Sequence, residues 1–173
     1  MPRNVEIKAR VDDPAAVASM ATGLAGSGPE VIRQHDTFYA ARRGRLKLRR
    51  LEGGRGELIA YDRPDGTGPR TSDYHLYRTE RHEELGGVLA AGLTAIGDVR
   101  KTRRLWHVGR TRVHLDAVEG LGDFLELEVV LAAGEGVEAG RREAEELMDR
   151  LGIDKSRLIS GAYVDLLGEA EKT

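Results

Sequence analysis

The fold of this chain is decided by one stretch of sequence, His114-Leu-Asp-Ala-Val-Glu-Gly-Leu-Gly-Asp-Phe-Leu-Glu-Leu-Glu128. Apolar residues alternate with polar ones on both sides of Gly120 and Gly122, and this period of two is typical of strands with one buried face. Glycines between two such runs favour a tight reversal of the chain. The stretch therefore predicts an antiparallel β-hairpin.

The predicted hairpin places acidic side chains on one surface. Side chains two positions apart on a strand share a face, so Glu126 and Glu128 project together, as do His114 and Asp116. Carboxylates that lie side by side repel one another unless a cation or a set of bases holds them. A hard divalent metal is the first interpretation of this cluster, and a structural network of ion pairs is the alternative.

Similar polar strips occur on other segments. In Asn4-Val-Glu-Ile-Lys-Ala-Arg10, the polar side chains share one face and the apolar ones share the other, as on a strand. Strips rich in bases follow at Arg45-Leu-Lys-Leu-Arg49, Lys101-Thr-Arg103 and Arg110-Thr-Arg-Val-His114. A single strip of this kind is usually a solvated outer face. Its repetition on several strands favours a shared charged surface.

The order of the elements predicts the architecture. Strands are expected at 3–11, 30–41, 45–52, 56–63, 72–81, 98–109, 110–118 and 123–132, and helices at 14–24, 82–95, 136–150 and 160–167. Antiparallel strands with polar inner faces suggest a barrel whose lumen holds charge. We therefore expect one domain over 1–173 with an α+β fold, an eight-stranded antiparallel β-barrel with helices packed outside. Trp106 and Tyr163 are expected in the core.

Composition agrees with a compact enzyme. The 173 residues are enough for one domain, and the net charge of −2 gives no overall basic field for nucleic acid. The chain has no cysteine, which excludes disulfides and thiol chemistry. The first residues, Met-Pro-Arg-Asn, carry no apolar signal region, and no run is long enough for a membrane span. A cytoplasmic location without a membrane partner is expected, and a homodimer is left open.

Taken together, the strips resemble the CYTH family, which includes class IV adenylate cyclases, thiamine triphosphatases and inorganic triphosphatases of the triphosphate tunnel type. The stretch Asn4-Val-Glu6-Ile-Lys8-Ala-Arg10 resembles the family's opening Glu-x-Glu-x-Lys strand. Further matches are Lys47-Leu-Arg49 to an Arg-x-Arg strand, Lys101-Thr-Arg103 to a Lys-x-Arg strand, and Asp116, Glu126 and Glu128 to the closing carboxylates. The resemblance runs from about residue 3 to about residue 167.

Three positions depart from the family pattern. Asn4 replaces the first Glu, which removes one expected carboxylate. Lys47 replaces an Arg, which keeps the charge but loses the two-pronged grip on phosphate. Asp62 stands where the family often has a Lys, so Arg63 is the candidate to compensate. The segment 61–74 resembles the bacterial class IV cyclase-like branch.

The resemblance implies a charged tunnel that binds a triphosphate together with Mg²⁺ or Mn²⁺. The residues that it assigns to the metal are Glu6, Asp116, Glu126 and Glu128. Those that it assigns to phosphate are Lys8, Arg10, Lys47, Arg49, Arg63, Lys101 and Arg103, with Lys8 and Arg103 also as candidate catalytic residues. His114 is a further candidate near the tunnel. The histidines lack the spacing of a zinc pair on a helix, so zinc is not expected.

Several functions are compatible with such a tunnel. Hydrolysis of an inorganic, nucleotide or thiamine triphosphate is favoured, because it needs only a held phosphate chain, a metal and an oriented water. The alternative is cyclisation of ATP to cyclic AMP and pyrophosphate, which also needs a pocket for adenine and ribose. A further alternative is a binding module, or an enzyme for another phosphorylated or diphosphate ligand, as the missing carboxylate at Asn4 allows.

Overall fold

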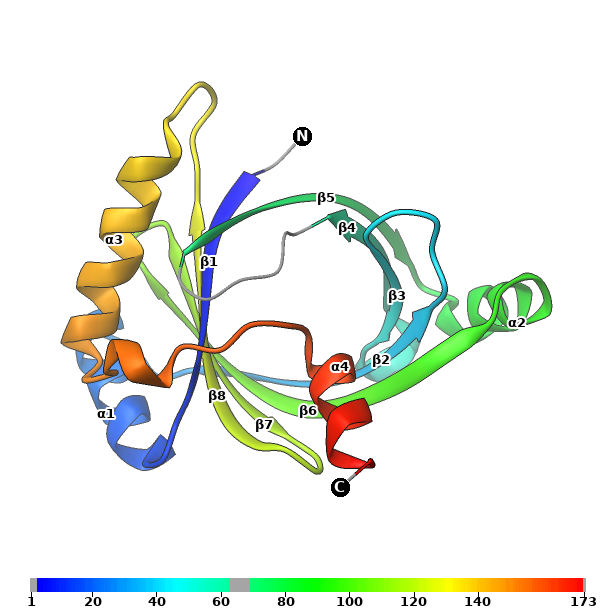
Figure 1. The fold of residues 1–173 in the computed structure, drawn as a ribbon, viewed down its shortest axis with the longest axis horizontal. Coiled ribbons are helices and arrows are strands. Elements are labelled where there is room, and N and C mark those ends of the chain that lie inside the picture. The colour runs from blue at the N-terminus through cyan, green and yellow to red at the C-terminus, as the bar shows by residue number, and fades with distance from the viewer. Residues whose placement is uncertain (1–2, 63–68, 173) are drawn as a thin grey trace.

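The computed structural model describes residues 3–62 and 69–172, and within these ranges the strands form a closed antiparallel barrel (Figure 1). The strands are β1 (Arg3–Arg10), β2 (Glu30–Tyr39), β3 (Arg45–Arg50), β4 (Gly56–Asp62), β5 (Arg70–Thr79), β6 (Ala95–Val108), β7 (Thr111–Val118) and β8 (Gly122–Val130). Around the barrel they follow the order β1-β5-β4-β3-β2-β6-β7-β8, and β8 pairs with β1. The predicted eight-stranded α+β barrel is confirmed.

Helices and short turns complete the described chain. They are α1 (Pro14–Ala25), α2 (His82–Gly92), α3 (Val137–Arg150), α4 (Tyr163–Ala170) and the 3₁₀ turns η1 (Glu52–Gly54) and η2 (Lys155–Arg157). The boundaries follow the expected ones within a few residues. The largest shifts are of three residues, at the end of α2, the start of β6 and both ends of α4. Strand β6 begins at Ala95 because α2 already ends at Gly92 and Leu93 is extended. No helix in the described ranges is both long and apolar enough to cross a membrane.

The hairpin that decides the fold forms as predicted. Gly120 and Gly122 have φ values of 80° and 103°, which residues other than glycine rarely adopt. The reversal pairs β7 with β8 so that His114 lies opposite Glu126. On the other side of β8, Lys8 of β1 also lies opposite Glu126. These two registers close the barrel and bring the polar faces of β1, β7 and β8 together.

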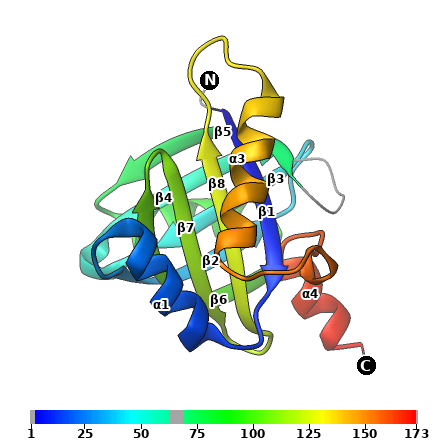
Figure 2. The same ribbon diagram turned by 90° about the vertical axis from the view of Figure 1, so that its left-hand side faces the viewer.

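The main hydrophobic core lies outside the barrel rather than inside it. Helices α1 and α3 cover the outer face of β1, β7 and β8 (Figure 2). The fully buried side chains there include Val5, Ile7, Val113, Leu115, Leu125 and Leu127. Trp106 is 2% exposed in this core and donates a hydrogen bond to the Thr22 hydroxyl, as expected. Burying each such side chain contributes about 1.5–3 kcal/mol to the free energy of unfolding. The outer face therefore stabilises a barrel whose inner face is charged.

A second apolar cluster closes one end of the barrel beneath α4. It joins Phe38, Val99, Phe124 and Tyr163. The rings of Phe124 and Tyr163 lie 5.0 Å apart and tilted. The segment between α3 and α4 runs beside the end of β1, where Leu158 pairs with Ala9, to reach this cluster (Figure 1).

Helix α3 approaches β1 closely at Gly140. A Cβ atom at this glycine would lie 2.7 Å from Leu131 Cδ2 and 2.8 Å from Val5 Cγ2. We expect Gly140→Ala to lower the free energy of unfolding by about 1–3 kcal/mol, the usual cost of overpacking a core. The control is Gly87→Ala in α2, where nothing lies within 4 Å. That change should be neutral or stabilising by up to about 1 kcal/mol, and denaturant unfolding measures both. Equal effects of the two substitutions would contradict the close packing of α3.

Candidate active site

The lumen of the barrel contains a cavity of about 440 Å³ that is lined by charged side chains from most of the strands. The predicted site residues that line it are Glu6, Lys8, Lys47, Arg49, Lys101, Arg103, Glu126 and Glu128. Their side chains converge because each occupies an inward position on its strand. The expectation of one shared charged surface is therefore confirmed by the structure.

Asp116 anchors the bases on β6. It lies directly opposite Arg103, which donates from Nε and Nη2 to its two oxygens at 2.7 Å each. Lys101 and the Tyr163 hydroxyl donate to the same carboxylate at 3.1 and 3.2 Å. Asp116 is fully buried. Burial raises the pKa of Asp116, but Arg103 and Lys101 lower it more, so the group stays charged.

This environment differs from the one that the sequence predicted for Asp116. Its oxygens accept hydrogen bonds from two bases and a hydroxyl, and the side chain is absent from the described cavity lining. The ion-pair network, the alternative in the sequence analysis, describes Asp116 better than a metal site. Tyr163, expected as a plain core residue, has its hydroxyl in this network.

A second buried aspartate was missed by the sequence analysis. Asp36 of β2 is 2% exposed and lies directly opposite Arg49 of β3. Arg49 donates to it from Nε and Nη2 at 2.8 Å each, and Lys47 donates from Nζ at 2.8 Å. Although burial raises the pKa of Asp36, Arg49 and Lys47 hold it well below its usual value. The available signal was a lone acid on the inward face of a strand that precedes a Lys-x-Arg strand.

Lys8 is held by the chain that closes one end of the barrel. Its Nζ donates to the Gly161 carbonyl at 3.1 Å and lies 3.3 Å from Glu126. The same Nζ lies 3.9 Å from the centre of the Tyr163 ring, a distance typical of a cation–π contact. Burial raises the pKa of Glu126, but Lys8 and Lys101 lower it well below the usual range.

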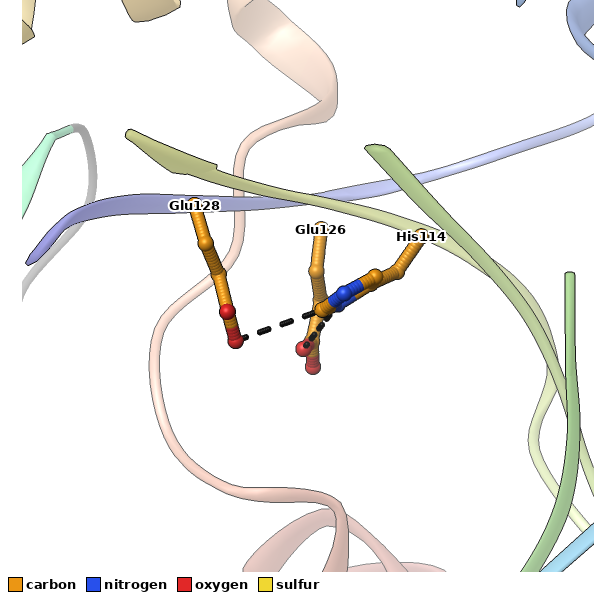
Figure 3. A group of neighbouring side chains, drawn as sticks. All are labelled: His114, Glu126 and Glu128. Atoms are coloured by element: carbon orange, nitrogen blue, oxygen red, sulfur yellow. Dashed lines mark ion pairs between the residues drawn. The ribbon is translucent and has the colours of Figure 1, made fainter. Parts of the chain in front are cut away.

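One group of side chains in the lumen fits a metal ion. His114, Glu126 and Glu128 each offer a ligand atom, and these atoms lie within 4.8 Å of one another. Figure 3 shows the His114 ring reaching toward both carboxylates, at 3.9 and 3.8 Å from Nδ1. The Nδ1 atom is buried without a hydrogen-bond partner among the described residues. Burial and Arg103 lower the pKa of His114, which favours the neutral imidazole that metals bind.

Two residues of β1 lie near this group. Glu6 lines the cavity and pairs in register with Glu128. Asn4, which replaces a family carboxylate, is 2% exposed and also lines the cavity. Its Oδ1 atom has no hydrogen-bond partner among the described residues, so a neutral oxygen lies at the position where the resemblance in the sequence implied a carboxylate.

Two other predicted or suspected bases, Arg10 and Arg45, lie elsewhere. Arg10 is exposed at the end of β1, over the ring of Phe124 at 5.2 Å, and is absent from the described cavity lining. Arg63 lies outside the described residues. Arg45 pairs with Asp165 of α4 instead of facing the cavity.

Strands β4 and β5 contribute a different wall that the sequence analysis did not find. Ile59 and Tyr61 line the cavity from β4 and lie opposite Leu76 and Tyr74 of β5. These four residues form an apolar and aromatic surface, next to the ion pair of Glu57 and Arg78 on the same two strands. Its signal in the sequence was only the weak alternation of 56–62 and 70–79.

Comparisons with known proteins agree with the geometry. Residues 2–163 match the CYTH domain, so the chain belongs to the CYTH family. The Aeromonas hydrophila protein named adenylate cyclase CyaB is 24% identical over 170 residues, which cover 92% of this chain and 85% of that protein.

Solved structures share the fold. The PH1012 protein from Pyrococcus horikoshii OT3 has a TM-score of 0.83 at 20% identity, covering 95% of this chain and 99% of its own. HpAC1 from Hippeastrum, described as a putative adenylyl cyclase that reveals a dominant triphosphatase activity, has a TM-score of 0.66 at 15% identity. The match covers 96% of this chain and 95% of HpAC1. At these identities the likeness shows the fold.

The two interpretations of Asp116 make opposite predictions for its removal. As a holder of bases, Asp116→Asn should lower the free energy of unfolding at pH 7 by about 3–5 kcal/mol, because Lys101 and Arg103 stay buried without their counter-charge. The control is Glu52→Gln, which breaks an exposed pair with Arg33 and should cost at most about 1 kcal/mol. Denaturant unfolding in EDTA measures both. An Asp116→Asn protein of unchanged stability that no longer binds Mn²⁺ would restore the metal assignment.

Proposed function

We propose that this protein is a metal-dependent enzyme that hydrolyses a triphosphate bound in its barrel. One observation carries the proposal: bases from β1, β3 and β6 and carboxylates from β1 and β8 line the same cavity. A triphosphate carries several negative charges, and a ring of bases offsets them. A lumen with bases alone would bind the anionic product too tightly to release it. The nearby carboxylates reduce the positive charge and can bind a cation.

The bases act by holding the phosphate chain. Arg49 and Arg103 are fixed by their aspartates, which leaves the rest of each guanidinium to bind phosphate oxygens. Lys8, fixed by Gly161 and Glu126, adds a point charge from the opposite wall. Because these groups are ordered before substrate arrives, little reorganisation is needed as charge develops during transfer. We assign Lys8 and Arg103 to the phosphoryl group that is transferred.

His114, Glu126 and Glu128, with Glu6 beside them, are the residues that would hold the cation. Two carboxylates favour Mg²⁺ or Mn²⁺, and an imidazole shifts the preference toward the transition metal. When bound, such an ion would offset charge on the phosphate oxygens and orient the chain. A cytoplasmic location and a single domain over 1–173 stay predictions from the sequence, and a homodimer stays open.

Cyclisation of ATP to cyclic AMP and pyrophosphate is the second candidate. The wall formed by Ile59, Tyr61, Tyr74 and Leu76 offers an organic group an apolar surface beside the phosphate site. The name of the Aeromonas relative supports this candidate, and the activity described for HpAC1 supports hydrolysis. The two reactions differ in the nucleophile, which is water in one and the ribose 3′-oxygen in the other, so the placement of the substrate decides between them.

Product analysis tests the proposal directly. The purified protein, incubated separately with ATP and inorganic tripolyphosphate in Mg²⁺ or Mn²⁺, should release phosphate. Glu126→Gln should reduce the rate by about 100-fold or more, the usual effect of removing an electrostatic group from a site. Cyclic AMP as the main product with tripolyphosphate untouched would establish cyclisation. No turnover of either compound would contradict an enzyme of triphosphates.

The imidazole in the metal cluster predicts a preference for Mn²⁺. We expect His114→Gln to weaken Mn²⁺ binding by at least the roughly tenfold that even outer-shell partners are worth, and to weaken Mg²⁺ binding less. Calorimetric titration of the protein without nucleotide measures both affinities. His75→Gln on β5 is the control, because His75 is exposed. Equal losses for the two metals would remove His114 from the ligand set.

A further inference from the structure

The arrangement at Asp116 occurs a second time in the barrel, at Asp36. In each case an aspartate lies in register directly opposite the Arg of a Lys-x-Arg strand: Asp116 opposite Arg103, and Asp36 opposite Arg49. Each Arg donates from Nε and Nη2 to both oxygens of its aspartate, at 2.7 Å in the first unit and 2.8 Å in the second. The Lys two residues earlier donates to the same aspartate in both units, at 3.1 and 2.8 Å.

The two units lie side by side on the same wall. The strand order β3-β2-β6-β7 places one Lys-x-Arg strand and its aspartate next to the other Lys-x-Arg strand and its aspartate. All four bases line the same cavity, and each aspartate is almost completely buried against its bases, although Asp36 also reaches the cavity lining. A repeat of the same contacts at the same register indicates the same task.

We propose that Asp36 is a positioning residue for the reaction: it fixes Arg49 and Lys47 as a second phosphate-binding pair and keeps Lys47 charged. The inference rests on the proposed function, since it concerns the same phosphate site. Asp36 would repel a phosphate, and both of its oxygens already accept hydrogen bonds from Arg49 and Lys47. It acts through the two bases, as Asp116 acts through Lys101 and Arg103.

The charges around Lys47 explain why it needs an acid. Besides Asp36 on β2, Lys47 has Arg49 on its own strand, Lys101 on β6 and the ring of Tyr61 on the neighbouring β4. Arg103 on β6 and Glu57 on β4 line the same cavity. The side chain is mostly buried, at 13% exposure. Burial and Arg49 lower the pKa of Lys47 to about 7, and Asp36 is the largest influence that raises it. An Arg at this position would stay charged without help.

The sign of the effect follows from these charges. Without Asp36 the pKa of free Lys47 falls further, because the influences that lower it remain. An anion binds best to the charged Lys, so binding weakens as pH rises through the pKa of the free protein. In Asp36→Asn this weakening begins at a lower pH than in the wild type. At low pH, where Lys47 is charged in both proteins, the loss of the negative charge of Asp36 should instead strengthen the binding of an anion.

The measurement is the affinity for inorganic tripolyphosphate between pH 6 and pH 8, with the same Mg²⁺ concentration throughout. We expect the ratio of the dissociation constants of Asp36→Asn and the wild type to rise by about fivefold across this range, which corresponds to a fall of one unit from a Lys47 pKa of about 7. Taking the ratio at each pH cancels the ionisation of the ligand. The control is Asp98→Asn on β6, whose side chain bonds His35 and Thr37 and is half exposed. The ratio of the dissociation constants of Asp98→Asn and the wild type should stay constant between pH 6 and pH 8.

Each result decides the inference. A flat ratio for Asp36→Asn, in a protein that folds and binds tripolyphosphate, would overturn the positioning role. If Asp36→Asn does not fold, Lys47→Arg decides instead: the wild type should lose affinity relative to this variant as pH rises from 6 to 8. Equal pH profiles of these two proteins would overturn the role of Lys47 and the inference. A wild-type protein that binds no tripolyphosphate would overturn the proposed function, and the inference with it.

Discussion

The structure depends on the pairing of charges that face the inside of the barrel. A charge removed from water is costly unless an opposite charge and hydrogen bonds compensate it. On the inner wall this compensation comes from buried aspartates. Each accepts two hydrogen bonds from an Arg and a third from a Lys, as Asp36 does. Since the inner face is thus polar, the apolar face of each strand must turn outward. Helices α1 and α3 are then needed to cover it.

The same pairing prepares the lumen for a charged ligand. Bases of the lumen are already paired with acids: Lys8 lies against Glu126, and Arg112 donates to Glu128. A cation on the glutamates and a polyanion on the bases would replace one set of opposite charges by another. Because each charge would keep an opposite charge beside it, this exchange limits the cost of binding a highly charged substrate in a closed space. The aspartates beneath the Lys-x-Arg strands keep the bases in place throughout.

Alternation in the sequence was enough to predict the strands, the hairpin at Gly120 and the inward set on β1 and β8. It tells which face a side chain takes, but neither how deep the side chain lies nor which strand sits beside it. Arg10 shares its face with Lys8 yet reaches past the end of the cavity. Asp116 shares the face of His114, and only the β6–β7 register shows that bases cover it. Asp36 needed the β2–β3 register in the same way.

The closing segment shows why packing and chemistry cannot be separated in this barrel. Tyr163 packs on Phe124, as a core residue does, but the same ring lies over Lys8 and its hydroxyl donates to Asp116. The Gly161 carbonyl beside it accepts from Lys8. A change that loosened this segment would therefore free a base of the site as well as an apolar contact. The match to the CYTH domain extends to residue 163, which is the residue at which the chain completes the wall of the cavity.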